Sequence, residues 1–161
     1  MRLCQIVVAT ALLSIATLPV CWALSGKHSS HDRTAEVEAL LGSKRWTFRP
    51  TTMQNASLGT TRDVYAYNFA LAFDGGRIEF HLPIESVSFV IYTEPFSATA
   101  DNYSLVLVDE GWWRVLFTVK ADGEEWAVEM AVVARSGVAN LAVVAREWTM
   151  RYVGALYPLE K

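Results

Sequence analysis

Hydrophobic and polar residues alternate along most of the chain after Gly42, and this spacing predicts β-strands. The clearest example is 77–82, where Ile, Phe and Leu alternate with Arg, Glu and His. Neighbouring side chains of a strand point to opposite faces, so such a segment buries one face and exposes the other. We predict about eight strands on this basis. They are 45–49, 63–73, 77–82, 86–93, 103–108, 112–120, 125–134 and 141–153.

The links between the predicted strands are short from residue 101 onward, and several contain the glycines that tight hairpins need. Strands joined in this way run antiparallel, because a parallel neighbour requires a much longer crossover. A meander of this size leaves two unpaired edges unless it closes on itself. We therefore predict an all-β fold, an antiparallel meander closing into a barrel after one short helix. The alternative is a two-sheet β-sandwich.

Two of the predicted strands are apolar on both faces. The segments 131–134 and 141–145 contain only Ala, Val and Leu. Such strands are typical of positions that are covered from both sides, by a second sheet, a helix or a partner subunit.

A short helical pattern precedes the strands. Over 35–41 the apolar residues have helical spacing, Asp32 or Thr34 can cap the first turn, and Gly42 can end the helix. The polar stretch 24–33 has no apolar period, so we expect a flexible lead-in. A single β-rich domain over 34–161 follows.

Residues 1–23 have the organisation of a secretory signal peptide, with a basic residue, an apolar stretch and small residues before a cleavage site. We expect cleavage after Ala23 or after Ser25. Both cysteines lie inside this leader, so the mature domain would carry no thiol. The sequence thus predicts a secreted or periplasmic protein, with a lipid anchor through Cys21 as the alternative. No later segment has the roughly 20 apolar residues of a spanning helix.

Composition and motifs argue against several classes of function, namely nucleic-acid binding, metal binding and catalysis by a serine nucleophile. The chain has 161 residues, is 52% hydrophobic and carries a formal net charge of -3, with no basic stripe for nucleic acid. His81 is the only histidine of the predicted domain, so we expect no metal and no cofactor. No Gly-x-Ser-x-Gly elbow is present, and no catalytic residue is predicted. Asn55 and Asn102 begin Asn-x-Ser triplets and are glycosylation candidates if the source is eukaryotic.

Arg77, Glu79 and His81 share one face of a predicted strand. A Glu beside a His can act as an acid/base pair. Opposite an Ile-Phe-Leu face, however, such residues are more typical of the solvent side of an amphipathic strand. The sequence leaves open whether they face solvent or a cavity.

The order of these elements resembles the lipocalin-like (calycin) β-barrels: a short helix, a strand with an early Trp, about seven more strands and a last strand with Arg. In that family an arginine stacks on the tryptophan and closes the barrel floor. The resemblance assigns these roles to Trp46 and to Arg151 or Arg146. It also implies a cup for a small apolar molecule. The aromatic candidates to line it are Tyr65, Tyr67, Phe69, Phe73, Trp113 and Trp126.

We therefore expect an exported, non-enzymatic binding protein that holds a small apolar ligand in an aromatic-lined barrel. A second hypothesis is a protein–protein interaction module, such as an inhibitor, an assembly subunit or a homodimer, that uses the apolar strands near 126–145. A lipocalin-like enzyme is the third hypothesis, because lipocalin-like barrels sometimes host chemistry and the fold alone does not exclude it.

Overall fold

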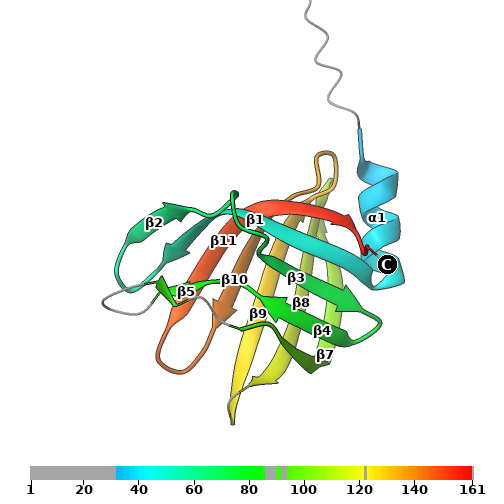
Figure 1. The fold of residues 1–161 in the computed structure, drawn as a ribbon. Coiled ribbons are helices and arrows are strands. Elements are labelled where there is room, and N and C mark those ends of the chain that lie inside the picture. Colours follow the sequence, from blue (N-terminus) through cyan, green and yellow to red (C-terminus); the bar gives the residue numbers. More distant parts are fainter. Residues whose placement is uncertain (1–31, 86–89, 92–93, 122, 161) are drawn as a thin grey trace, which may run out of the picture.

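The computed structural model describes residues 32–85, 90–91, 94–121 and 123–160. One helix, α1 (Thr34–Ser43), is followed by antiparallel strands (Figure 1). The strands are β1 (Arg45–Asn55), β2 (Thr60–Asp63), β3 (Ala70–Asp74), β4 (Arg77–His81), β5 (Ile84–Glu85), β6 (Val90–Ile91), β7 (Phe96–Asp109), β8 (Trp112–Ala121), β9 (Glu124–Val133), β10 (Val138–Val144) and β11 (Thr149–Pro158). The predicted signal peptide 1–23 and most of the predicted lead-in lie outside the described residues.

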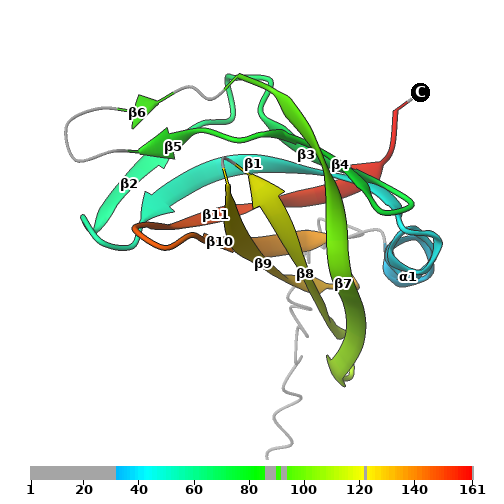
Figure 2. The same ribbon diagram turned by 90° about the horizontal axis from the view of Figure 1, so that it is seen from below.

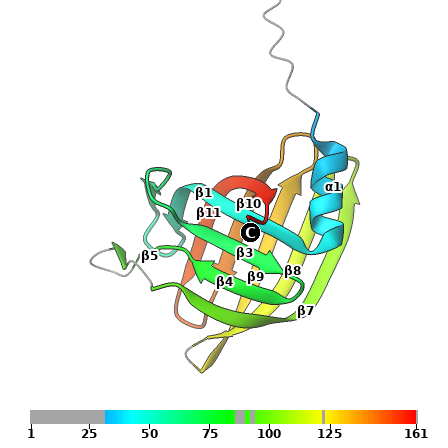
Figure 3. The same ribbon diagram turned by 45° about the vertical axis from the view of Figure 1, so that its right-hand side comes forward.

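Eight of these strands form a closed antiparallel barrel. They follow the order β1-β3-β4-β7-β8-β9-β10-β11, and β11 pairs back with β1 (Figures 1 and 3). This last pairing runs from Trp46 opposite Pro158 to Asn55 opposite Met150. The predicted barrel is confirmed, and the sandwich alternative is excluded because the last strand completes the wall.

The wall closes where the backbones of β1 and β11 approach each other closely. Gly154 lies opposite Pro50, and a Cβ atom on Gly154 would lie 2.1 Å from the carbonyl oxygen of Arg49. The register shifts between Pro50 and Thr52, so the missing N–H of the proline falls at an irregular position of the ladder. The predicted end of the first strand at residue 49 is wrong, because this bulge accommodates Pro50 and β1 continues to Asn55.

Two other predicted boundaries change next to β1. The residues between the first two predicted strands hold the second half of β1 and most of β2, which pair in a hairpin that includes Gly59 at a positive φ of 67°. The expected strand 63–73 is reduced to β3. The residues before β3 form a turn instead, in which the Tyr67 amide donates a hydrogen bond to the Val64 carbonyl oxygen.

The barrel has eight strands, as predicted, but they are not the same eight segments. The expected strand 141–153 is a hairpin of two strands, β10 and β11, and in the turn between them the Ala145 amide donates to the Trp148 carbonyl oxygen. The expected strand 86–93 lies partly outside the described residues. Its described part, β6, pairs with β5 in a separate two-stranded sheet and not with the barrel.

Helix α1 lies at one end of the barrel, whereas β5 and β6 lie at the other (Figure 2). The prediction of a helix over 35–41 is confirmed, but its predicted cap is not. The N-cap residue is Arg33, whose side chain makes no capping hydrogen bond, although Asp32 Oδ1 accepts the Thr34 amide at 3.0 Å. The helix does not end at Gly42. It ends at Ser43, and the C-cap residue after it, Lys44, adopts the left-handed conformation with φ 55°. The helix residues buried against the barrel are Val37 and Leu41.

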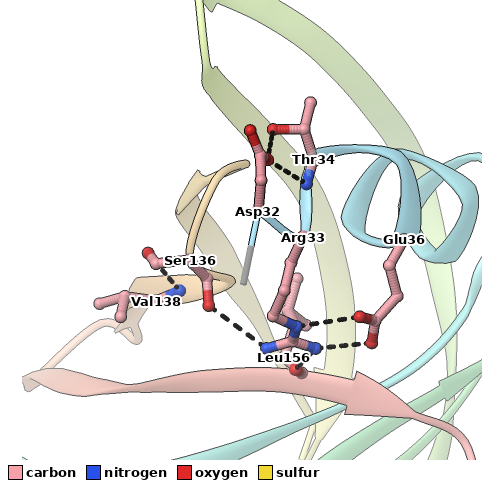
Figure 4. Close-up of polar contacts among 7 residues, drawn as sticks. All are labelled: Asp32, Arg33, Thr34, Glu36, Ser136, Val138 and Leu156. Atoms are coloured by element: carbon pink, nitrogen blue, oxygen red, sulfur yellow. Dashed lines mark hydrogen bonds and ion pairs between the residues drawn. The ribbon is translucent and has the colours of Figure 1, made fainter. Parts of the chain in front are cut away.

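Arg33, directly before α1, ties the helix to the barrel (Figure 4). Its guanidinium donates two hydrogen bonds to Glu36, at 2.7 and 3.0 Å, and one each to the carbonyl oxygens of Ser136 and Leu156, at 3.3 and 3.0 Å. The hydrogen-bonded Glu36 raises the pKa of Arg33. The last residue of the predicted flexible lead-in is therefore anchored.

Large side chains fill the inner face of the wall. On β8, Val115, Phe117 and Val119 are buried, and the residues between them are exposed or half-buried. The largest fully buried side chains of the described chain are Trp46, Tyr152, Phe48, Phe73 and Phe80. This inward alternation of large residues is the pattern that predicted the strands.

Candidate functional site

Phe73, a predicted ligand-binding residue, belongs to a packed group of rings near α1. It stacks on Trp46 with ring centroids 5.1 Å apart, and Tyr103 and Phe117 approach it to 4.9 and 5.5 Å. The Tyr103 hydroxyl donates to the carbonyl oxygen of Leu41 in α1 at 3.4 Å, and burial raises the pKa of that hydroxyl. Aromatic contacts of this kind stabilise a core. The rings at this end of the barrel therefore contact one another.

Trp126 belongs to a second group of rings. It is 5% exposed, and its ring centroid lies 5.6 Å from Phe80, 5.7 Å from Phe96 and 5.0 Å from Trp148. Trp113 is half-buried against the core, and its indole N–H is buried without a partner among the residues that the structure describes. Both predicted tryptophans thus point inward, where their described neighbours are other side chains.

Tyr65, Tyr67 and Phe69 lie between β2 and β3 and not on a strand, because the chain turns there. Tyr65 is 74% exposed. Tyr67 and Phe69 border a pocket of about 420 Å³ beside the β1–β2 hairpin, which we call the mouth pocket. Its lining residues are Met53, Thr61, Arg62, Asp63, Val64, Tyr67 and Phe69. Two of the predicted ligand-binding residues therefore meet at one pocket.

A buried carboxylate connects β5 to the β1–β2 hairpin next to the mouth pocket. The Glu85 side chain is 3% exposed and accepts hydrogen bonds from the Thr60 hydroxyl and, at 2.8 Å, from Arg62 Nε. Asn55 Nδ2 donates to the Glu85 carbonyl oxygen at 2.8 Å. The Thr60 hydrogen bond, together with Arg62, holds the pKa of Glu85 below its ordinary value against the opposing effect of burial. We call these four residues the Glu85 clasp, which sequence reasoning missed because its members lie far apart in the chain.

Arg151 does not stack on Trp46. The register places Arg151 opposite Gln54, whereas Trp46 lies opposite Pro158 near the other end of β1. Arg151 is exposed on the outer face of the wall, and Trp46 is buried on the inner face. The side chain stacked on the indole is Phe73 instead, so the arginine assigned by resemblance has a different environment. The alternative, Arg146, is exposed in the turn before β11.

A groove of about 390 Å³ crosses the outer face of β1, β11, β10 and β9, and we call it the outer-wall groove. It is lined by Thr52, Gln54, Thr61, Glu129, Ala131, Asn140, Leu141, Ala142, Arg151, Tyr152 and Val153. The strand register explains its shape. One row of outward residues across the sheet is Thr61, Gln54, Arg151, Ala142 and Glu129, and the next is Thr52, Val153, Asn140 and Ala131. The two alanines leave a hollow between longer side chains.

The two charged residues on the rim of the outer-wall groove have different partners. Glu129 Oε1 accepts the Nε of Arg114 at 2.9 Å in an ion pair. The Arg151 guanidinium forms no hydrogen bond or ion pair with any part of the chain that the structure describes. The groove therefore combines an apolar floor, amide and hydroxyl side chains, and one unpaired cation. Small outward residues in two apolar strands are the only sequence signal for it.

Within the described residues, no second sheet or helix covers the outer face of 131–134 and 141–145, and cover by a partner subunit stays a prediction. Val132 and Val143 are fully buried on the inner face, whereas Val144 on the outer face is 44% exposed. The small apolar residues on the outer face of β9 and β10 form the floor of the outer-wall groove.

The two predicted glycosylation sites differ in environment. The Asn55 side chain is 3% exposed, and its amide nitrogen donates within the Glu85 clasp. A glycan on that nitrogen is incompatible with this packing. Asn102 is exposed in β7 at a positive φ of 58°, within the register shift between Asp101 and Ser104, and its glycosylation stays a prediction.

Arg77 and Glu79 face the surface and not a cavity within the barrel. Their side chains are 68% and 66% exposed and lie 3.8 Å apart. His81 is half-buried, and its ring meets the ring of Phe69 edge-on at 5.3 Å. The described residues contain no group of three His, Cys, Asp or Glu side chains that could hold a metal ion. No helix within them is long and apolar enough to cross a membrane.

Comparison with known proteins supports the fold. No protein-family model matches the sequence, and no curated protein matches it. Among solved structures, the chain is similar to the crystal structure of a DUF4251 family protein from Bacteroides eggerthii DSM 20697, with a TM-score of 0.65 and 14% identity over 79% of this chain and 89% of that chain. At this identity the likeness shows the fold alone. The lipocalin-like resemblance beyond the barrel itself stays a prediction.

Proposed function

We propose that this chain is an exported, non-enzymatic binding protein whose ligand lies in the outer-wall groove. The observation that carries the proposal is the groove itself, a hollow of about 390 Å³ with a floor of small apolar side chains and a polar rim. Sites for small molecules have this size and this combination of apolar surface with a few polar groups. The barrel interior is the less favoured site, because Phe73 and Trp126 contact neighbouring rings.

Export is part of the proposal and depends on residues 1–23. Expression of the full chain in a secreting host, followed by intact-mass measurement of the exported fraction, tests it. We expect a product that begins at Leu24 or Gly26. A full-length product retained inside the cell would contradict export and leave the binding proposal to be judged separately.

Filling the groove tests the binding site. Ala142→Phe places a ring on the floor, and Ala127→Phe is the matched control, because Ala127 is exposed on the outer face of β9 and does not line the groove. Both variants are titrated, alongside the unchanged protein, with a panel of small amphiphiles by native mass spectrometry. We expect Ala142→Phe to abolish binding and Ala127→Phe to retain it. Equal binding by all three proteins would refute the groove as the site.

The mouth pocket is the second candidate site, and it is closer to the hypothesis of an apolar ligand entering the barrel. Tyr67, Phe69 and Met53 border its volume of about 420 Å³. In this case Phe69→Ala would weaken ligand binding, and Ala142→Phe would leave it unchanged. The same titration panel therefore separates the two sites.

A further inference from the structure

The outer-wall groove contains a guanidinium without an acidic partner. Elsewhere on the wall, Arg45, Arg49 and Arg114 each pair with a carboxylate within 3.0 Å. Arg151 has no such partner in the described chain. Its neighbours in the sheet row are Gln54 and Ala142, which carry no charge. An arginine offers a planar pair of donors that matches a carboxylate.

The opposite rim of the groove does not offer a competing charge. Glu129 lies one residue beyond Ala142 in the same row, and its carboxylate is already paired with Arg114 at 2.9 Å. The groove thus has one unpaired positive charge at one side and a neutralised pair at the other. Charge complementarity favours an anion at Arg151.

The remaining groove residues suit the rest of such a ligand. Ala142 and Ala131 form an apolar floor that extends from Arg151 across β10 and β9. Gln54, directly opposite Arg151, has an amide N–H₂ group that can donate to a second carboxylate oxygen. A flexible hydrocarbon chain would bury apolar surface along this floor.

We infer that the outer-wall groove binds a monocarboxylate with an apolar tail, its carboxylate at Arg151 and its tail over Ala142 and Ala131. This inference rests on the proposed function and adds the chemical class of the ligand. The binding is non-covalent and needs no further group.

The test compares two probes that share one tail. Decanoate and decanol are titrated below their micelle or solubility limits into the unchanged protein, Arg151→Gln and the control Arg146→Gln, by isothermal titration calorimetry. Arg146 is the matched control because it is exposed and does not line the groove. We expect decanoate to bind more tightly than decanol, and Arg151→Gln to weaken decanoate binding about 10- to 100-fold. Decanol binding and the Arg146→Gln variant should be unchanged.

Two further measurements keep the test decisive. Added salt should weaken decanoate binding and not decanol binding, and Arg151→Lys should recover only part of the affinity, because lysine keeps the charge but not the paired donors. Equal affinity of the two probes, no effect of Arg151→Gln, or no decanoate binding would overturn the monocarboxylate class. The proposed function fails separately, when no panel ligand is sensitive to Ala142→Phe.

Discussion

Apolar residues lie on both the inner and the outer face of β9 and β10, yet only the inner face is a core. On the inner face, Met130, Val132 and Leu141 are at most 1% exposed. On the outer face, Ala131 and Ala142 occupy the corresponding positions and form the floor of a groove. The comparison shows that hydrophobicity alone does not separate the two faces, because Val143 is fully buried on the inner face and Val144 is 44% exposed on the outer face. Large residues fill the space between strands, and small residues leave a hollow.

The largest expected effect comes from opening the wall that separates these two faces. Gly154→Ala places a Cβ atom 2.1 Å from the backbone of β1, which cannot move without breaking the β1–β11 ladder. We expect a loss of about 4 kcal/mol or more in the free energy of unfolding, or no folded protein.

Urea unfolding followed by tryptophan fluorescence measures the loss. Gly42→Ala is the control, because nothing lies within 4 Å of its added Cβ atom and Gly42 is inside α1. It should stabilise the protein by roughly 0.5–1 kcal/mol. Near-equal stability of Gly154→Ala and the unchanged protein would show that the wall closes differently.

A pair of neighbours on β8 tests the two faces directly. Phe117 is 2% exposed and contacts the rings of Phe73 and Tyr103, whereas Leu116 is half-buried on the outer face. We expect Phe117→Ala to cost about 3 to 5 kcal/mol of unfolding free energy and Leu116→Ala about 1 kcal/mol. The comparison fails if the two variants lose equal stability in the same urea titration.

The Glu85 clasp offers a further contrast with the packed apolar core. Its carboxylate is a buried charge that holds the β1–β2 hairpin to β5. The pKa of Glu85 is lowered in the folded state, so ionised Glu85 stabilises the fold above its ordinary pKa of 4.5. That stabilisation is lost as the pH falls below 4.5 through the folded-state pKa. Glu85→Gln should therefore be less stable at pH 7 and lose less stability on acidification.

Unfolding free energies of both proteins between pH 7 and pH 3 check this expectation. Glu79→Gln is the matched control, since Glu79 is 66% exposed and its nearest cation, Arg77, lies 3.8 Å away. A steeper loss in Glu85→Gln than in the unchanged protein would contradict the assignment.

The smallest effect on stability is expected on the floor of the groove. Ala142→Phe adds a ring to the outer face, where the hollow has room for it, and should change the free energy of unfolding by no more than about 0.5 kcal/mol. Thermal unfolding of this variant and of Ala127→Phe measures the change. A large loss would show that the outer face is packed as tightly as the core.

The alternation of residues predicted the strands where one face is clearly polar. The segments 77–82, 112–120 and 125–134 correspond to β4, β8 and β9 with small changes at the ends. Alternation also continued across 141–153, where the chain in fact turns at 145–148. The buried positions change from odd-numbered residues in β10 to even-numbered residues in β11, but 141–145 are apolar on both faces, so the local pattern did not reveal this change of phase.

The outer-wall groove and the Glu85 clasp depend on residues that are distant in the chain. Arg151 meets Gln54 only because β11 pairs with β1, and Glu85 meets Arg62 only because β5 folds beside the β1–β2 hairpin. The resemblance to lipocalin-like barrels predicted that Arg151 stacks on Trp46. The strand register instead places Arg151 opposite Gln54, with its side chain on the outer face. The closure of the barrel decides which residues pair across neighbouring strands, and the local spacing of hydrophobic residues does not encode these pairs.

By itself the amino-acid sequence determined the class of this protein: an antiparallel β-fold with a helix before it, because the period of hydrophobic residues and the glycine-containing links restrict the backbone locally. Tertiary structure decided the rest. The closure of β11 onto β1 decides which face of each strand is inside, which rings fill the core, and which small residues remain outside as a groove beside Arg151. The physical reason is that register relates residues far apart in the chain, and a shift of one residue exchanges the two faces.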